Sequence, residues 1–314
     1  MQILRSIAEL ASVPGPIFLA IGVFDGVHLG HQAVIRRAVA DAARAQGTAV
    51  VVTFDPHPMR VLRPESAPRL LTSTPHKIAL LKELGATHLL VIPFDQAFAA
   101  TPPEAFVKAL AEACRPLREI CVGHSWSFGK GRAGNLQLLD RIGNELGFEE
   151  VGIPAVTVDG EIVSSTLIRA AVERGDLEKA ERLLGRRFSI LGTVKHGQHL
   201  GHQLGFPTAN LSAHKEQYPP NGVYAVKARL AGETEFRDGV VNIGVRPTVE
   251  NEGTRLLELH LFDFEGDLYG RDIEVIFHRF LREEKRFPNL EALKAQIACD
   301  VSQARAFLSA SPQA

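Results

Sequence analysis

The stretch IFLAIGVFDGVHLGH, residues 17–31, sets the architecture of the first half of the chain. It opens with a continuous apolar run, which is typical of a β-strand buried on both faces, as in a parallel sheet. Glycines follow at Gly22 and Gly26, and a helical pattern begins beyond them. The stretch therefore predicts a strand, a glycine-rich turn and a helix in succession. In a wound α/β sheet, ligands bind at this carboxyl end of the strands.

The same alternation continues outward to about residue 184. Further apolar runs rich in Val, Ile and Leu occupy residues 49–54, 88–94 and 119–123. Helical patterns separate these runs: one ends at Gly47, and another, residues 102–114, begins with two prolines. Strands that alternate with helices predict a wound α/β domain with a parallel sheet.

The pattern changes after Gly185. Residues 223–230 and 255–262 alternate between the two faces of a strand, with apolar side chains gathered on one of them. Several such strands joined by glycine-containing turns predict an antiparallel barrel or sandwich. The chain closes with an amphipathic helix whose apolar residues share one face, namely Leu290, Leu293, Ile297, Val301, Ala304 and Leu308. We therefore expect two domains, residues 1–184 and 185–310.

Composition narrows the class of protein. A chain of 314 residues suits two domains better than one core. Its 35 Lys and Arg residues balance 36 Asp and Glu residues, so we expect no nucleic-acid partner. No stretch approaches the roughly 18 apolar residues of a membrane span, and no signal peptide is evident. Three cysteines without metal-site spacing suit a reducing cytoplasm.

The segment GVFDGVHLGH, residues 22–31, carries the first candidate site. A helix that begins there offers backbone N–H groups and a partial positive charge to a phosphate. His28 and His31 are three residues apart, so one helical turn places both on the same side. Imidazoles at that point can stabilise the charge that develops during nucleotidyl transfer. The competing interpretation is a glycine turn with two surface histidines.

The segment resembles the signature of the HxGH nucleotidyltransferase superfamily. With TFDPHP (53–58), residues 123–135 and residues 164–185, it resembles the FMN adenylyltransferase module of bacterial bifunctional FAD synthetases. The resemblance implies a Rossmann-like domain in which His28, His31 and Arg169 are catalytic. It also implies a flavin near Ser125 and Trp126, and an ATP site formed by Gly22, Phe24, Asp25, His28, His31, Thr166 and Arg169.

The segment GHQLGFPTANL, residues 201–211, carries the second candidate site. If it is extended, Thr208 and Asn210 project to the same side and offer neutral oxygens two residues apart. Mg²⁺ takes oxygen ligands and shares them with nucleotide phosphates, so neutral protein ligands suit a site to which ATP brings the negative charge. For this short pattern alone, an ordinary turn containing Asn is the simpler interpretation.

The segments NGVYAV (221–226), VVNIGVRPT (240–248), LELHLFDFEGDLYG (257–270) and FLREEKRF (280–287) follow in order, and together they resemble riboflavin kinase. That resemblance implies a small antiparallel β-barrel with a terminal helix. It assigns Thr208 and Asn210 to Mg²⁺, or a similar divalent cation, and to the phosphates of ATP. Glu258 is implied as the general base, and Arg282 and Phe287 are implied as flavin-binding residues. Alternation along the strand places Glu258 opposite its leucines.

These observations predict a bifunctional enzyme that phosphorylates riboflavin to FMN and adenylylates FMN to FAD, with ATP as the co-substrate of both reactions. Ser125, Trp126 and Leu167 depart from the adenylyltransferase pattern, and Gln198 and His202 depart from the kinase pattern. The first three motivate an alternative in which only the kinase is active and the first domain is a degraded flavin- or nucleotide-binding module. A non-catalytic flavin carrier is a third hypothesis. The sequence leaves the oligomeric state open.

Overall fold

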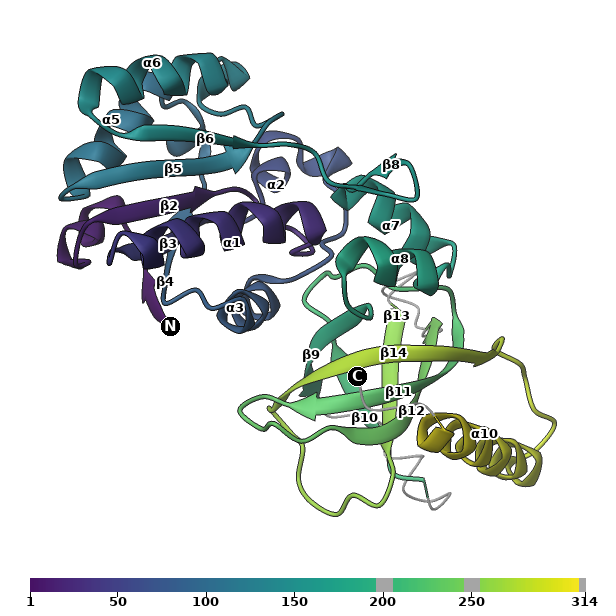
Figure 1. Cartoon of the computed structure of the whole chain (residues 1–314). Helices are drawn as coiled ribbons and strands as arrows, with labels where there is room; N and C mark the ends of the chain where they lie inside the picture. Colours follow the sequence, from purple (N-terminus) through teal and green to yellow (C-terminus); the bar gives the residue numbers. More distant parts are fainter. Residues whose placement is uncertain (196–205, 246–254, 311–314) are drawn as a thin grey trace. The chain divides into compact units, whose positions relative to one another are not determined.

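A computed structural model describes residues 1–195, 206–245 and 255–310 of the chain. The chain divides into two compact units (Figure 1). The first comprises Met1–Arg69 and Lys77–Ser165, and the second comprises Leu70–His76 and Thr166–Ala314.

The first unit is built on a six-stranded parallel sheet. Its strand order is β1 (Gln2–Leu4), β4 (His88–Pro93), β3 (Thr48–Asp55), β2 (Ile17–Ile21), β5 (Leu117–Gly123) and β6 (Glu149–Ile153). The strands β3 and β5 flank β2, so the direction in which the chain builds the sheet reverses there. Such a reversal is the topological switch point at which open α/β sheets bind ligands. The predicted parallel sheet is confirmed, and the segment of residues 22–31 leaves the strand at this point.

Helices cover both faces of that sheet. The helices up to α6 are α1 (Leu29–Arg44), α2 (Pro58–Leu62), α3 (Thr74–Glu83), α4 (Gln96–Ala99), α5 (Pro103–Ala113) and α6 (Leu136–Leu146), with short 3-10 turns at Ile7–Ser12, Pro64–Ser66 and Lys130–Arg132. Alternate residues of β2 face opposite layers: Leu19 lies in the apolar cluster formed with α5 and α6, whereas Ala20 lies in the cluster formed with α1 and α3. A small hairpin, β7 (Thr157–Val158) and β8 (Glu161–Ile162), precedes the second unit.

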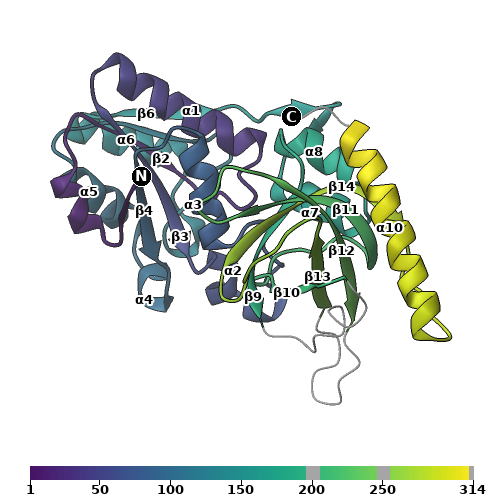
Figure 2. The same cartoon turned by 90° about the horizontal axis from the view of Figure 1, so that it is seen from below.

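The second unit is a closed six-stranded antiparallel barrel, as the sequence pattern predicts. The strand order is β10 (Ala209–Ser212), β13 (Arg255–Leu261), β12 (Arg237–Val245), β11 (Gly222–Leu230), β14 (Asp272–Arg282) and β9 (Ser189–Lys195). The terminal helix α10 (Leu290–Ala310) packs on β11, β12 and β14 and runs along the outside of the barrel (Figure 2).

The amphipathic face of α10 is only partly buried. Ala304 and Leu308 are buried against Val223 and Val240 of the barrel, whereas Leu290 at the start of the helix is 56% exposed. The apolar period therefore predicts the helix correctly, but its first turn extends past the surface it covers. No helix among the described residues combines the length and apolar character required to cross a bilayer.

The two helices that precede residue 185 group with the barrel, and the predicted domain bounds at residues 184 and 185 stay a prediction. Residues 164–185 form two helices, α7 (Ser165–Glu173) and α8 (Leu177–Leu184), separated by Gly175 at φ +79°. A Cβ at Gly175 would lie 3.2 Å from the Pro220 ring, so this turn lies directly against a loop of the barrel unit. From Thr166 onward these helices belong to the barrel unit, and each has buried apolar residues, among them Ile168 on α7 and Leu183 on α8.

Candidate active sites

The loop between β2 and α1 has an unusual backbone conformation. Phe24 and Val27 have φ values of +51° and +42°, a region that non-glycine residues rarely adopt, and Gly26 has φ +85°. The Phe24 ring is buried and folds back over Gly22, where a Cβ would lie 2.7 Å from the ring. Only glycine therefore fits at position 22, and the loop is held in one compact shape.

His28 and His31 lie together at the start of α1, as predicted. His28 is the N-cap residue, and its Nδ1 accepts a hydrogen bond from the backbone N–H of His31 at 3.3 Å. The two rings stack with centroids 3.5 Å apart, and the Phe24 ring meets His31 edge-on. Because Nδ1 of His28 accepts, the proton of its neutral ring is on Nε2, which can donate to a ligand. A Cβ on Gly30 would lie 3.2 Å from the His28 ring.

Helix α7 contributes two of the other predicted adenylyltransferase residues, Thr166 and Arg169. Ser165, the first residue of α7, donates from Oγ to the carbonyl of the buried Asp25 at 2.9 Å, which ties the end of the first unit to the loop. Thr166 and Arg169 follow on α7 but belong to the second unit. Their predicted contact with the phosphates of ATP stays a prediction.

Ser125 and Trp126 follow directly on β5, the strand next to β2 at the switch point. Ser125 is exposed, whereas Trp126 is half-buried and stacks on Phe128 with centroids 4.2 Å apart. One face of the indole is therefore used inside the protein. The predicted flavin contact of this pair stays a prediction.

In the barrel, the structure brings Asn210 and Glu258 together. They are directly opposed across β10 and β13, and Glu258 is opposed on its other side by Asn242 of β12. Directly opposed residues of antiparallel strands have their Cβ atoms about 4.5–5.5 Å apart on one face. The flanking Leu257 and Leu259 are buried on the other face. Three polar side chains thus form a row across three adjacent strands.

Thr208 lies just before β10, exposed, at the alternate position from Asn210. This turn is attached to β13 because the ring of His260 donates from Nδ1 to the carbonyl of Pro207 at 2.8 Å. His260 shares the polar face of β13 with Glu258, as the alternation predicts. The hydroxyl, amide and carboxylate oxygens gathered here are the hard donors that Mg²⁺ prefers, so the residues present fit that ion.

Asn242 was not singled out from the sequence, although the motif VVNIGVRPT contains it. Its position two strands from Asn210 becomes visible only with the register of the barrel. The end of the motif, residues 246–248, lies outside the described residues, as do Gln198 and His202.

Arg282 and Phe287, the predicted flavin-binding residues of the kinase, lie at the end of β14 and after it. Arg282 makes a two-pronged ion pair with the buried Asp300 of α10, with an Nη2–Oδ2 distance of 2.7 Å. Its guanidinium also lies over the Phe287 ring, 5.8 Å from the centroid. The ion pair gives Arg282 a structural task in fastening the terminal helix. Binding of flavin by this pair stays a prediction.

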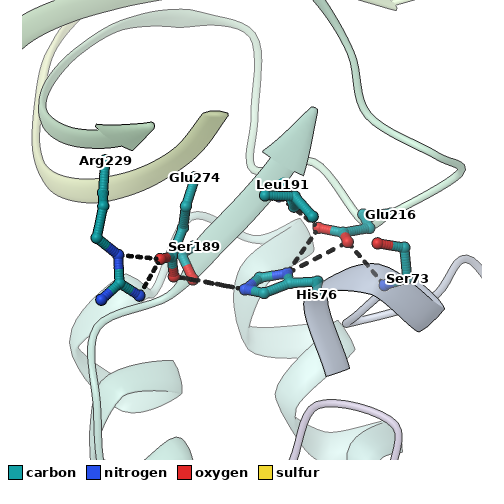
Figure 3. A network of polar contacts seen from close by, with 7 residues as sticks. All are labelled: Ser73, His76, Ser189, Leu191, Glu216, Arg229 and Glu274. Atoms are coloured by element: carbon teal, nitrogen blue, oxygen red, sulfur yellow. Dashed lines mark hydrogen bonds and ion pairs between the residues drawn. The ribbon is translucent and has the colours of Figure 1, made fainter. Parts of the chain in front are cut away.

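A third polar cluster, which contains none of the predicted site residues, lies in the barrel unit (Figure 3). The ring of His76, 1% exposed, lies between two carboxylates: Nδ1 is 3.2 Å from Glu216, and Nε2 is 3.5 Å from Glu274. Ser189 donates to Glu274 at 2.8 Å, and Arg229 donates to its other oxygen at 2.7 Å. The charges are balanced when His76 is protonated.

The pKa values in this cluster follow from that arrangement. Burial alone lowers the pKa of His76, but the charge of Glu216 and hydrogen bonds to both carboxylates outweigh it and raise the pKa to about 9. Burial alone raises the pKa of Glu274, yet His76 and Arg229 lower it to about 2. Both groups are therefore charged at neutral pH.

A buried group of possible metal ligands in the first unit, Asp41, Glu119 and Cys121, has protein partners instead. Asp41 forms ion pairs with Arg37 and Arg44 on its own helix. The Cys121 thiol donates to Glu119 at 2.9 Å, and burial raises the pKa of the thiol. A thiol that stays protonated is a poor metal ligand.

Comparisons with known proteins match a different family model to each half of the chain. The model of the FAD synthetase family matches residues 11–167, and the model of the riboflavin kinase family matches residues 184–308. A bifunctional riboflavin kinase/FMN adenylyltransferase from Pseudomonas fluorescens is 40% identical over 311 residues, covering 99% of each chain. The protein of the same name from Escherichia coli strain K12 is 39% identical over 308 residues, covering 98% of each chain. The crystal structure of a macrolide-efflux protein from Streptococcus pneumoniae aligns with TM-score 0.81 and 26% identity over 97% of this chain and 99% of that one.

Proposed function

The chain belongs to the family of bifunctional riboflavin kinases/FMN adenylyltransferases, and on that premise we propose that its two reactions take place at the loop of residues 22–31 and at the polar row of the barrel. The chain phosphorylates riboflavin to FMN and adenylylates FMN to FAD. It therefore has both activities, rather than the kinase alone.

Adenylyl transfer is assigned to the loop and helix start at the carboxyl end of β2. A phosphate oxygen of FMN attacks the α-phosphorus of ATP, and the bond to the departing pyrophosphate breaks. His28 and His31 face that pyrophosphate and donate hydrogen bonds to the charge that builds on it, helped by the N-terminus of α1. Arg169 and Thr166 complete the ATP site, and Ser125 and Trp126 hold the flavin. The stacked pair at the helix start supports this assignment.

Phosphoryl transfer is assigned to the polar row of the barrel. Glu258 accepts the proton of the riboflavin 5′-hydroxyl as that oxygen attacks the γ-phosphorus of ATP, and ADP leaves. Thr208 and Asn210 would hold Mg²⁺ and the phosphates, and the ion, when bound, would offset negative charge of the ATP phosphates. The direct opposition of Asn210 and Glu258 supports the assignment because it places the predicted base beside a predicted metal ligand.

The remaining assignments are coarser. Arg282 and Phe287 contribute to the flavin site of the kinase. We place the chain in the cytoplasm, where ATP is available and its three free thiols stay reduced. Its partners are the small molecules riboflavin, FMN and ATP, without nucleic acid or membrane.

One experiment tests the assignment of two sites. The purified chain is incubated with ATP and Mg²⁺ and with either riboflavin or FMN, and the flavins are separated by chromatography. We expect riboflavin to give FMN and then FAD, and FMN to give FAD directly. His28→Ala should lower FAD formation about 10²-fold or more and leave FMN formation intact. Glu258→Gln should lower FMN formation about 10²- to 10⁴-fold and leave FAD formation from supplied FMN intact. If either change abolished both reactions in a folded protein, the assignment of separate sites would be wrong.

A further inference from the structure

Beneath the loop of residues 22–27 lies a charged group that the proposed mechanism does not use. Lys77, on α3, is 4% exposed, and among the described residues it is the one buried lysine. Its Nζ donates to the carbonyl of Val23 at 2.7 Å and to Oγ1 of Thr53 at 3.3 Å. Thr53, at the end of β3 in the segment TFDPHP, donates to the same carbonyl at 3.0 Å. Two donors from two elements thus converge on one loop oxygen.

A buried ammonium group is expensive to maintain. Desolvation disfavours the charged form, and burial lowers the pKa of Lys77 to about 8, although the charges of Asp25 and Asp55 act in the opposite direction. Asp25 is in the loop itself and Asp55 closes β3. An apolar side chain would fill this space without that cost, so packing alone does not explain the lysine.

The loop that Lys77 touches needs external support. The two non-glycine residues with left-handed backbone, Phe24 and Val27, each cost on the order of 1–3 kcal/mol, and such conformations persist only when surrounding contacts enforce them. Side-chain donors hold three alternate carbonyls of the loop. The donors are Lys77 and Thr53 for Val23, Ser165 for Asp25, and Gln32, at 3.0 Å, for Val27.

This arrangement matters for an anionic ligand. A carbonyl oxygen turned toward a triphosphate would repel it, whereas a carbonyl fixed to a buried donor is kept away from the ligand. Val23 is the first of the three carbonyls, directly before the strained Phe24 that packs on His31. The two donors therefore act at the start of the strained part of the loop.

We propose that Lys77 is a positioning residue for adenylyl transfer: its ammonium group fixes the Val23 carbonyl and thereby holds the loop that carries Asp25 and His28 in the shape that binds the ATP phosphates. The inference rests on the proposed adenylylation site at that loop. Lys77 acts through the backbone and does not touch the substrate. Thr53 supports the same carbonyl as a weaker, uncharged partner.

The test compares four variants of the full chain: Lys77→Met, Lys77→Arg, Thr53→Val and, as a matched control, Lys82→Met at an exposed position of the same helix. FAD formation from FMN is measured with varied ATP, and FMN formation from riboflavin is measured in the same preparations. We expect Lys77→Met to lower kcat/KM for ATP in FAD formation about 10- to 100-fold and Thr53→Val about threefold. FMN formation should be unchanged in all variants.

The pH profile distinguishes positioning by a charge from simple packing. FAD formation by the unmodified chain should decline above about pH 8 as Lys77 loses its proton, while FMN formation should not share that decline. Phosphate groups are fully ionised well below this pH, so the substrates do not produce it. Lys77→Arg retains its charge and should lack the decline.

The outcomes separate this inference from the proposed site. If His28→Ala removes FAD formation but Lys77→Met and Thr53→Val leave the ATP dependence unchanged, the role of Lys77 is wrong and the site stands. If His28→Ala spares FAD formation, both fall. If Lys77→Met unfolds the first unit, Thr53→Val and the pH profile decide instead. The inference would be overturned if Thr53→Val had an unchanged KM for ATP and Lys77→Arg still lost FAD formation above about pH 8.

Discussion

His76 and Lys77 are consecutive residues of α3, yet their buried side chains belong to polar clusters in two different compact units. His76 lies between Glu216 and Glu274 in the barrel unit, whereas Lys77 supports the Val23 carbonyl in the α/β unit. Substitutions one residue apart should therefore affect different parts of the protein. This relationship permits matched experiments in which each position is the control for the other.

The first prediction concerns stability. His76→Leu removes the cation between two buried carboxylates, and loss of one partner from such an ion pair costs about 3–5 kcal/mol. We expect His76→Leu to lower the free energy of unfolding of the barrel unit, measured by urea titration, by that amount. Lys82→Leu, at an exposed position of the same helix, should change the free energy of unfolding by less than about 0.5 kcal/mol. Equal stability of the two variants would show that the His76 cluster contributes nothing.

The second prediction is a pair of opposite pH dependences. The folded chain raises the pKa of His76 from 6.5 to about 9, so its stabilising contribution is complete below pH 6.5 and is lost as the pH rises through 9. The pKa of Lys77 falls from 10.5 to about 8, so the unfolded chain binds the extra proton between these values. The free energy of unfolding of the α/β unit, which contains Lys77, should therefore increase as the pH rises above 8.

Calorimetry between pH 6 and pH 10 can separate these effects. The transition of the barrel unit should move to lower temperature above about pH 7, and His76→Leu should flatten that decline. The transition of the α/β unit should lose its alkaline gain in Lys77→Met. Transitions that move together in both variants would contradict the assignment of the two residues to separate units.

The third prediction concerns the kinase base. Glu258→Gln keeps the size of the side chain but removes its ability to accept a proton, and a general base contributes about 10²–10⁴ in rate. We expect kcat for FMN formation to fall within that range, with FAD formation from supplied FMN unchanged. Glu265→Gln, at an exposed turn of the same unit, is the control. A loss smaller than threefold would assign proton transfer to another group.

The periodic parts of this fold could be predicted well from the sequence. Buried apolar runs indicate the strands β2 to β5 of the parallel sheet, and alternation along residues 255–262 indicates the two faces of β13, with Glu258 opposite its leucines. Local patterns suffice there because a strand that is buried on one or both faces must carry the matching period.

Features that depend on pairing between distant segments could not be predicted. Asn242 joins Asn210 and Glu258 only through the register of β12, β13 and β10. His76 and Glu216 are 140 residues apart in sequence, and neither has a local pattern that indicates a buried ion pair.

The fourth prediction concerns the shape of the adenylylation loop. His28→Ala removes a hydrogen-bond donor to the developing charge, and we expect FAD formation to fall about 10²-fold or more. Gly30→Ala leaves His28 in place but adds a Cβ 3.2 Å from its ring, so the ring must shift by a few tenths of an ångström. A smaller loss, about tenfold, should follow, with the melting temperature nearly unchanged. If Gly30→Ala has no effect, adenylyl transfer does not depend on the exact orientation of His28.

The last prediction decides between two tasks for Arg282. Its ion pair with Asp300 fastens α10 to the barrel, and Asp300 is 3% exposed. If that task is the only one, Asp300→Asn and Arg282→Lys both weaken the two-pronged contact and should lower stability by similar amounts, on the order of 1–3 kcal/mol. Neither should then change KM for riboflavin in the folded protein. If Arg282 also orients the flavin beside Phe287, Arg282→Lys alone should raise KM for riboflavin severalfold, because the Asp300→Asn variant still contains the guanidinium group of Arg282. Steady-state kinetics of FMN formation, measured on samples verified as folded by their melting curves, separates the two results.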